Sequence, residues 1–226
     1  MKTKAQNISH AVMAQRFEPT DSLDNFPTPP WATRALFEHI LNGYALDKQT
    51  CLEPACGAGH MAKVMTEYFQ KVIASDIYPY GYGGTENYLD AKKRDLQVDW
   101  IITNPPFKRA EDFIKKSLSE AKCGVAMLTR TVFLESVGRY QRLFLTTPPS
   151  IVAQFCERVP IVKGRLDPRA TTATGYAWII WEKNSRNHTA LKWIKPCRKS
   201  LERDGDYDEV YSSRTDKGSE RSVISI

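Results

Sequence analysis

The feature that most constrains the fold of this chain is a strand–loop–helix–strand pattern in its N-terminal half. Residues 50–53 form a short strand-like run, residues 54–60 are mostly small, and residues 61–70 have the spacing of an amphipathic helix. Residues 71–76 are a second strand-like run that ends in an acid. A helix that connects two neighbouring strands usually makes them parallel, so the pattern predicts an α/β fold.

The loop of this unit has features of a nucleoside site. Gly57 and Gly59 allow a ligand to approach the backbone where a Cβ would clash. Asp76 stands 17 residues after Gly59, a spacing that resembles sites in which an acid binds both ribose hydroxyls. The loop lacks the full Gly-x-Gly-x-x-Gly pattern and a Walker lysine. Adenosine without phosphates therefore fits it better than a pyrophosphate.

A second motif follows the apolar run at residues 100–103, which is typical of a buried strand. The run ends in Asn104, Pro105, Pro106 and Phe107. The prolines cannot continue a sheet ladder, so the chain stiffens just beyond the strand. An amide, a backbone carbonyl and a ring presented together suit a planar group that carries an NH2. An ordinary proline-rich loop is the alternative interpretation of so short a motif.

Composition indicates one globular core. The chain has 226 residues, of which 42% are hydrophobic and 26% charged. It has no run that approaches the length of a membrane span, and its first ten residues lack the apolar core of a signal peptide. Five cysteines without Cys-x-x-Cys spacing favour a reducing cytoplasm over a disulfide framework, and no zinc-ligand spacing is present.

The remaining pattern predicts a doubly wound α/β sheet of about seven strands that finishes in a β-hairpin. We expect a first helix that begins at Pro30 and further helices near residues 109–121 and 133–145. Residues 1–24 are expected to be flexible, residues 25–194 to form the catalytic domain, and residues 195–226 to be a charged, mobile tail.

The ordered motifs resemble those of the S-adenosylmethionine-dependent DNA N6-adenine methyltransferases common in phages and prophages. The resemblance rests on Glu-Pro-Ala-Cys-Gly-Ala-Gly at residues 53–59, on Asp76, and on Asn-Pro-Pro-Phe at residues 104–107. The Phe-Pro-Thr-Pro-Pro-Trp segment at residues 26–31 precedes them, which is the gamma order of motifs, and residues 172–182 are similar to a late strand of the family.

The resemblance implies a Rossmann-like methyltransferase sheet, S-adenosylmethionine as cofactor, DNA as partner, and a bacterial or phage-infected cytoplasm. Asn104 and the Pro105 carbonyl would accept hydrogen bonds from the adenine amine, and Phe107 would stack on the flipped base. The methyl group would pass by direct in-line displacement. The implied cofactor residues are Phe26, Thr28, Glu53, Pro54, Ala55, Cys56, Gly57, Gly59, Asp76, Ile77 and Asn87.

The net charge of +6 comes entirely from residues 1–194, because the predicted tail has seven Lys/Arg and seven Asp/Glu. A basic body fits a polyanionic partner. The loop at residues 158–175 and the residue after Phe107 supply the candidate phosphate contacts, although a solvated loop is an equal alternative. These residues are Lys108, Arg158, Lys163, Arg165 and Arg169.

One departure from the family concerns the acid that contacts the cofactor adenine. Asn87 stands at the alignable position and Asp90 follows three residues later, so either could serve. Related Asn-Pro-Pro-aromatic enzymes act on RNA base amines or on protein glutamine, and an inactive cofactor-binding fold is a third hypothesis. Cytosine C5 methylation is disfavoured because Asn104 stands where a nucleophilic cysteine would be required.

Overall fold

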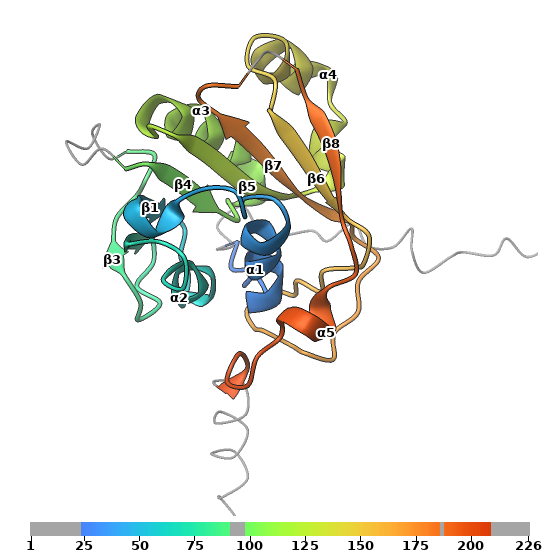
Figure 1. Ribbon diagram of the computed structural model, residues 1–226. Helices are drawn as coiled ribbons and strands as arrows, with labels where there is room; N and C mark the ends of the chain where they lie inside the picture. Colours follow the sequence, from blue (N-terminus) through green and yellow to red (C-terminus); the bar gives the residue numbers. More distant parts are fainter. Residues whose placement is uncertain (1–23, 91–97, 186–187, 209–226) are drawn as a thin grey trace, which may run out of the picture.

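The computed structural model describes residues 24–90, 98–185 and 188–208. The strands of these residues are β1 (Thr50–Glu53), β2 (Lys71–Asp76), β3 (Gly84–Thr85), β4 (Trp100–Thr103), β5 (Gly124–Arg130), β6 (Ile151–Phe155), β7 (Tyr176–Glu182) and β8 (Ala190–Ile194). They form one eight-stranded sheet with the order β3-β2-β1-β4-β5-β7-β6-β8 (Figure 1). The strand order reverses between β1 and β4, and open α/β sheets bind ligands at such a point.

The pairing confirms the predicted doubly wound, mostly parallel sheet. β3, β2, β1, β4 and β5 pair in parallel, whereas β7 runs antiparallel between β5 and β6. The sequence pattern does not predict β3 or β8, which pairs in parallel with β6 at one edge. β3 has only two residues, and the central residues of β8 are exposed. Neither strand therefore contains the buried apolar run that marks a strand in a sequence.

Helices cover both faces of the sheet (Figure 1). On one face α1 (Pro30–His39) and α2 (His60–Met65) pack over Trp100 and Ile102, and on the other face α3 (Ala110–Glu120) packs over Ile101. Successive strand residues point to opposite faces, so one buried strand contributes to both cores. Short 3-10 turns at η1 (Leu46–Lys48) and η2 (Phe107–Arg109) complete the central part of the chain.

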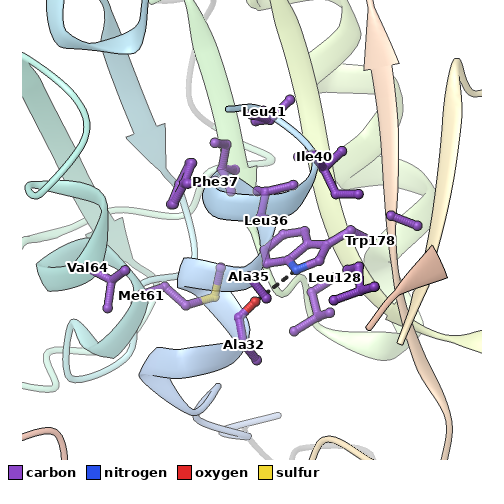
Figure 2. Close-up of a cluster of buried hydrophobic side chains, with 14 of the residues drawn as sticks. Ala32, Ala35, Leu36, Phe37, Ile40, Leu41, Met61, Val64, Leu128 and Trp178 are labelled. Atoms are coloured by element: carbon purple, nitrogen blue, oxygen red, sulfur yellow. Dashed lines mark hydrogen bonds between the residues drawn. The ribbon is translucent and has the colours of Figure 1, made fainter. Parts of the chain in front are cut away.

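α1 is fixed against the sheet along most of its length. It begins at Pro30, as the sequence predicts, because proline suits the first helical position. Ala32, Ala35 and Leu36 are fully buried, and the Trp178 indole N–H donates a 3.0 Å hydrogen bond to the Ala32 carbonyl (Figure 2). The segment that immediately precedes α1 lies at the carboxyl end of β4, where the Asn104 side chain donates a hydrogen bond to the Phe26 carbonyl.

The predicted helix at residues 133–145 is wrong as a continuous element. The structure has a 3-10 turn η3 (Thr131–Leu134), a short α4 (Val137–Arg139) and a π-helical turn η4 (Tyr140–Phe144). The Ser136 hydroxyl accepts a hydrogen bond from the Arg139 N–H and caps a new helix start, which interrupts the periodic pattern.

The predicted tail differs from the structure in its first part. A short helix, α5 (Arg198–Leu201), lies against α1, and Cys197 before it is only 3% exposed. The folded part of the chain therefore extends to residue 208 rather than to 194. The flexible segment predicted for residues 1–24 lies outside the described residues up to residue 23, and residues 209–226 of the predicted tail also lie outside them. Over the described ranges, no helix is both long and apolar enough to cross a membrane.

Candidate active site

A cleft opens where the strand order reverses, beyond the carboxyl ends of β1, β2 and β4. It contains about 930 Å³ of space, its open mouth included. Asn104 and Pro106 of the predicted catalytic motif line it. It is also lined by Phe26, Thr28, Glu53, Pro54, Ala55, Cys56, Gly57, Asp76, Ile77 and Asn87, which are all the predicted cofactor residues except Gly59.

Asp76 is held by the backbone of the loops beside it. Its Oδ2 accepts a 2.8 Å hydrogen bond from the Gly57 N–H and its Oδ1 accepts one of 3.1 Å from the Tyr78 N–H. The Cys56 N–H in turn donates to the Ser75 carbonyl. These bonds fix the carboxylate at the end of β2, where its remaining lone pairs can accept hydrogen bonds from hydroxyl groups.

Gly59 shapes the loop instead of lining the cleft. Its φ is +83°, and a Cβ built there would lie 2.4 Å from the Tyr82 ring. Both features require glycine, because other residues are strained at such a φ and a Cβ would overlap the ring. The residue is the N-cap of α2, so its conformation sets the direction in which the chain enters that helix.

Glu53 is a buried carboxyl without a full set of partners. It is 1% exposed, and its Oε2 has no hydrogen-bond partner among the described residues. Burial raises the pKa of Glu53 well above its usual range, and the nearby Asp76 carboxylate raises it further. A cation that entered the cleft beside Glu53 would offset both effects.

Asn104 carries the most informative contacts of the cleft. Its Nδ2 donates to the Phe26 carbonyl at 3.0 Å and to the Thr28 hydroxyl at 3.1 Å. A backbone carbonyl only accepts, so the NH2 group must face Phe26 and the amide oxygen must point the other way. That oxygen, Oδ1, is buried and has no partner among the described residues. A buried acceptor without a donor is costly, so a ligand N–H is its natural partner.

Pro105 and Phe107 do not line the cleft. Pro105 is buried, and Phe107 is partly exposed at the start of η2. The Phe107 N–H donates to the Asp24 carboxylate at 2.9 Å, and its ring lies 5.0 Å from the Phe26 ring. The Arg130 guanidinium lies over the Phe107 ring, 3.9 Å from its centre. Phe107 is therefore an aromatic platform beside the cleft.

The two aromatic residues at the entrance to α1, Phe26 before the helix and Trp31 in its first turn, have different surroundings. The sequence alone favours packing at a helix entrance for Phe26 and Trp31. Trp31 is completely buried and contacts the Phe155 ring edge-on, as that interpretation predicts. Phe26 lines the cleft, where the resemblance implies a cofactor residue, and its ring also contacts Phe107.

Of the two candidates for the adenine contact, Asn87 lines the cleft and Asp90 does not. The Asn87 Nδ2 donates to an Asp90 carboxylate oxygen at 2.5 Å, and its Oδ1 accepts from the Leu89 N–H. The two residues thus form one polar unit in which Asp90 orients the Asn87 amide.

The basic loop borders the cleft at one point. The Gly164 N–H donates to the Asn25 carbonyl at 2.8 Å, and Asn25 is a lining residue. Arg165 pairs with Asp167 at 3.2 Å, which partly neutralises it. The predicted phosphate contacts Lys108, Arg158, Lys163, Arg165 and Arg169 are all exposed.

Sequence reasoning missed several cleft residues. Asp24 and Asn25 stand directly before the Phe26 motif, so an extension of that motif by two residues would find them. Arg109 follows the Asn-Pro-Pro-Phe motif in the same way. Tyr80 and Phe113 carry no comparable signal, because their neighbours in sequence lie outside both motifs. The described part of the chain contains no group of three or more His, Cys, Asp or Glu side chains that could hold a metal ion.

No family model and no curated protein sequence matches this chain. Solved structures do match its fold. One is the modification subunit of a predicted type I restriction enzyme from Vibrio vulnificus, with a TM-score of 0.53 and 15% identity over 88% of this chain. Another is a predicted RNA methyltransferase from Pyrococcus horikoshii, with a TM-score of 0.54 and 15% identity over 76% of this chain. The chain has a Rossmann-like methyltransferase fold.

The methyltransferase fold accounts for most of the described residues, but the two neighbours differ in length. The matched region covers 94% of the Pyrococcus protein and 54% of the Vibrio protein. This chain thus spans about half the length of the restriction subunit that it resembles.

Proposed function

We propose that this protein is an S-adenosylmethionine-dependent methyltransferase that modifies the N6 amine of adenine in DNA. The observation that carries the proposal is the buried Asn104 Oδ1, an acceptor without a donor at the edge of the cleft. An exocyclic NH2 group supplies the missing N–H. The methyltransferase fold and the aromatic platform of Phe107 beside Asn104 support the same chemistry.

The residues of the cleft fit S-adenosylmethionine. The unpartnered Glu53 carboxyl suits the ammonium of the methionine part, and Gly57 leaves room for that part against the loop. Asp76 suits the ribose hydroxyls, and Asn87 can offer the adenine ring the second N–H and the second lone pair of its amide. When bound, S-adenosylmethionine supplies a methyl group on a positively charged sulfur.

The protein's own part in catalysis is to position and polarise the amine. The adenine N6 lone pair is delocalised into the ring, so the nitrogen is a weak nucleophile. Hydrogen bonds from N6 to the Asn104 Oδ1 and to the Pro105 carbonyl draw electron density back to that nitrogen. Because both acceptors are fixed before the base arrives, they need no reorganisation during the reaction. Phe107 would stack on the base and hold its plane.

DNA is the preferred substrate and RNA is the second candidate. Asn104 cannot distinguish an adenine amine in DNA from one in RNA. The resemblance of the motifs and the restriction-subunit neighbour favour DNA, whereas the RNA methyltransferase neighbour has a similar TM-score. A base in a duplex must leave the stack to reach this cleft, and exposed basic residues near the cleft suit the phosphates beside it.

Transfer of labelled methyl groups tests the proposal. The protein would be incubated with labelled S-adenosylmethionine and unmethylated DNA, and the DNA would be digested for nucleoside mass spectrometry. We expect labelled N6-methyladenine. Parallel reactions would contain RNA or cell extract. Label in RNA or protein with none in DNA would overturn the assignment to DNA, and binding of the cofactor without any transfer would overturn the assignment as an enzyme.

The raised pKa of Glu53 predicts how cofactor affinity depends on pH. An ammonium pairs with an ionised carboxylate, so a ligand with the same amino acid end, S-adenosylhomocysteine, should bind more tightly as pH rises. As pH rises toward the raised folded-state pKa of Glu53, the dissociation constant is expected to fall by up to about tenfold per pH unit, and above that pKa it should level off. Calorimetric titration would measure this, with Glu53→Gln as the matched variant. Equal pH profiles for both proteins would contradict the assignment.

The same pKa has a consequence for stability. A carboxyl whose pKa is raised by folding stabilises the fold below its unfolded pKa of about 4.3, and this contribution is lost as pH rises through the folded-state pKa. The ligand-free protein should therefore lose thermal stability toward neutral pH more steeply than Glu53→Gln does. Thermal unfolding of both proteins over the same pH range provides the control.

A further inference from the structure

Arg130 lies over the Phe107 ring, the ring that is proposed to stack on the target base. It is the last residue of β5, and its guanidinium carbon lies 3.9 Å from the centre of the Phe107 ring and 6.0 Å from that of Phe26. The shorter distance is that of a planar cation stacked on an aromatic face. The ring that is expected to stack on the substrate is thus already covered.

The charge of Arg130 is not neutralised by a carboxylate of the described residues. Its Nε is buried and has no hydrogen-bond partner among them. An arginine that serves only to stabilise a fold usually has a carboxylate or carbonyl partner, as Arg34 has with Glu67 and Asp206. Arg130 depends on the ring instead, so few interactions oppose its departure.

The Arg130 guanidinium lies over the Phe107 ring and beside Phe26: the two ring centres are 5.0 Å apart, and the guanidinium carbon lies 3.9 Å from one and 6.0 Å from the other. Phe26 lines the cleft and contacts Phe107 from there, whereas β5 contributes no residue to the lining. A target base must present its amine to Asn104 while it lies outside the cofactor's part of the cleft. Neither Phe107 nor Arg130 lines the cleft, so the ring face that Arg130 covers lies outside the cofactor's part of it and meets this requirement.

We propose that the Arg130 guanidinium holds the place of the target base on Phe107 in the free protein and leaves it when the base enters. This inference rests on the proposed function, since it assigns a second role to the same stacking site. The guanidinium is planar and shields the ring from water as a base would. Once displaced, its charge is available to the phosphate beside the flipped nucleotide. Arg130 and the target base therefore compete for the same face of the Phe107 ring, and Arg130 acts as a positioning residue.

Binding of 2′-deoxyadenosine, which has a base but no phosphate, tests the competition. Equilibrium dialysis with labelled nucleoside would use protein saturated with S-adenosylhomocysteine, so that the nucleoside cannot enter the cofactor's place. Arg130→Ala is expected to bind the nucleoside about three- to tenfold more tightly than the wild type, the strength of a stacked cation. Arg130→Lys keeps the charge without the plane and should lie between them. Adding Phe107→Ala to Arg130→Ala should abolish the gain.

Arg139 provides the matched control. Its guanidinium lies 3.9 Å from the centre of the Phe133 ring, and its Nε is also buried without a partner among the described residues, although its Nη1 donates to the Phe133 carbonyl. Arg139→Ala therefore removes the same kind of contact away from Phe107 and should leave nucleoside affinity unchanged. Thermal unfolding would establish that each variant is folded.

An unchanged, weaker or undetectable affinity of folded Arg130→Ala overturns the inference, because a residue that merely supports the ring from behind gives that result. The proposed function is judged separately by methyl transfer from wild-type protein. Transfer to DNA without a gain in nucleoside affinity would remove the inference alone. Absence of transfer to DNA, RNA or protein would remove the proposed function.

Discussion

Asn104→Ala is expected to lower the rate of methyl transfer by about a hundredfold or more, as loss of one fixed polar group does in other preorganised sites. The variant loses the Asn104 Oδ1, a buried acceptor that has no hydrogen-bond partner among the described residues. The Pro105 carbonyl alone would then polarise the amine. Single-turnover methyl transfer would measure the rate, and calorimetry with S-adenosylhomocysteine would measure cofactor affinity, which should change far less.

Thr28→Val tests whether the rate depends on the Asn104 amide oxygen itself or on the orientation of the Asn104 side chain. Thr28 accepts one of the two hydrogen bonds that orient Asn104, and valine keeps its shape. Asn104 would still donate to the Phe26 carbonyl, so the rate should fall only a few-fold. A similar loss in both variants would mean that the orientation of the side chain, rather than its oxygen, limits transfer. Activity of Asn104→Ala within tenfold of wild type would contradict the assigned role.

Local patterns predicted the central part of the fold. The run at residues 71–76, the small residues of the loop before it and the proline at position 30 each restrict the backbone within a few residues. The β2 strand, the turn into α2 and the start of α1 were therefore predictable. The cleft follows from them, because parallel strands place their carboxyl ends at one edge.

The state of the Asn104 amide was not predictable from the sequence. Asn104 takes its orientation from Phe26 and Thr28, which are 78 and 76 residues away in the chain. No pattern within the Asn-Pro-Pro-Phe motif indicates which side of the amide is already occupied. The contact of Arg130 with Phe107 was not predictable for a similar reason. An arginine at the end of a strand is usually exposed, and only the fold brings Arg130 to the Phe107 ring.

The end of the folded region was mispredicted because the charged residues after position 194 were expected to be exposed to solvent. Residues 195–208 have mixed charges, yet Asp206 forms a nearly buried ion pair with Arg34 of α1. The two residues are 172 positions apart in the chain. Arg34 is itself only 4% exposed. A charged residue is taken as exposed unless its partner is known, and the partner here is distant in sequence.

Arg34→Ala is expected to destabilise the protein by about 3 kcal/mol, near the lower end of the cost of breaking a buried ion pair. Arg34 donates to Asp206 at 2.7 and 2.9 Å, to Glu67 at 2.8 Å, and to the Leu201 carbonyl at 3.0 Å. Without it, the Asp206 carboxylate would stay nearly buried and lose this counter-ion, whereas Glu67 is more exposed and keeps Arg203. Urea unfolding would give the free energy of unfolding.

The matched control is Arg142→Ala, which removes a 2.9 Å ion pair with Glu111 on the surface. Because that arginine is well exposed, its loss should shift the urea midpoint far less. A double-mutant cycle of Arg34→Ala with Asp206→Ala should give a double variant that is more stable than the sum of the two single losses predicts. Equal midpoint shifts for Arg34→Ala and Arg142→Ala would contradict the buried role. Since α1 directly follows the segment that carries Phe26 and Thr28, loss of the Arg34 contacts should also weaken cofactor binding, which links the C-terminal segment to the cleft.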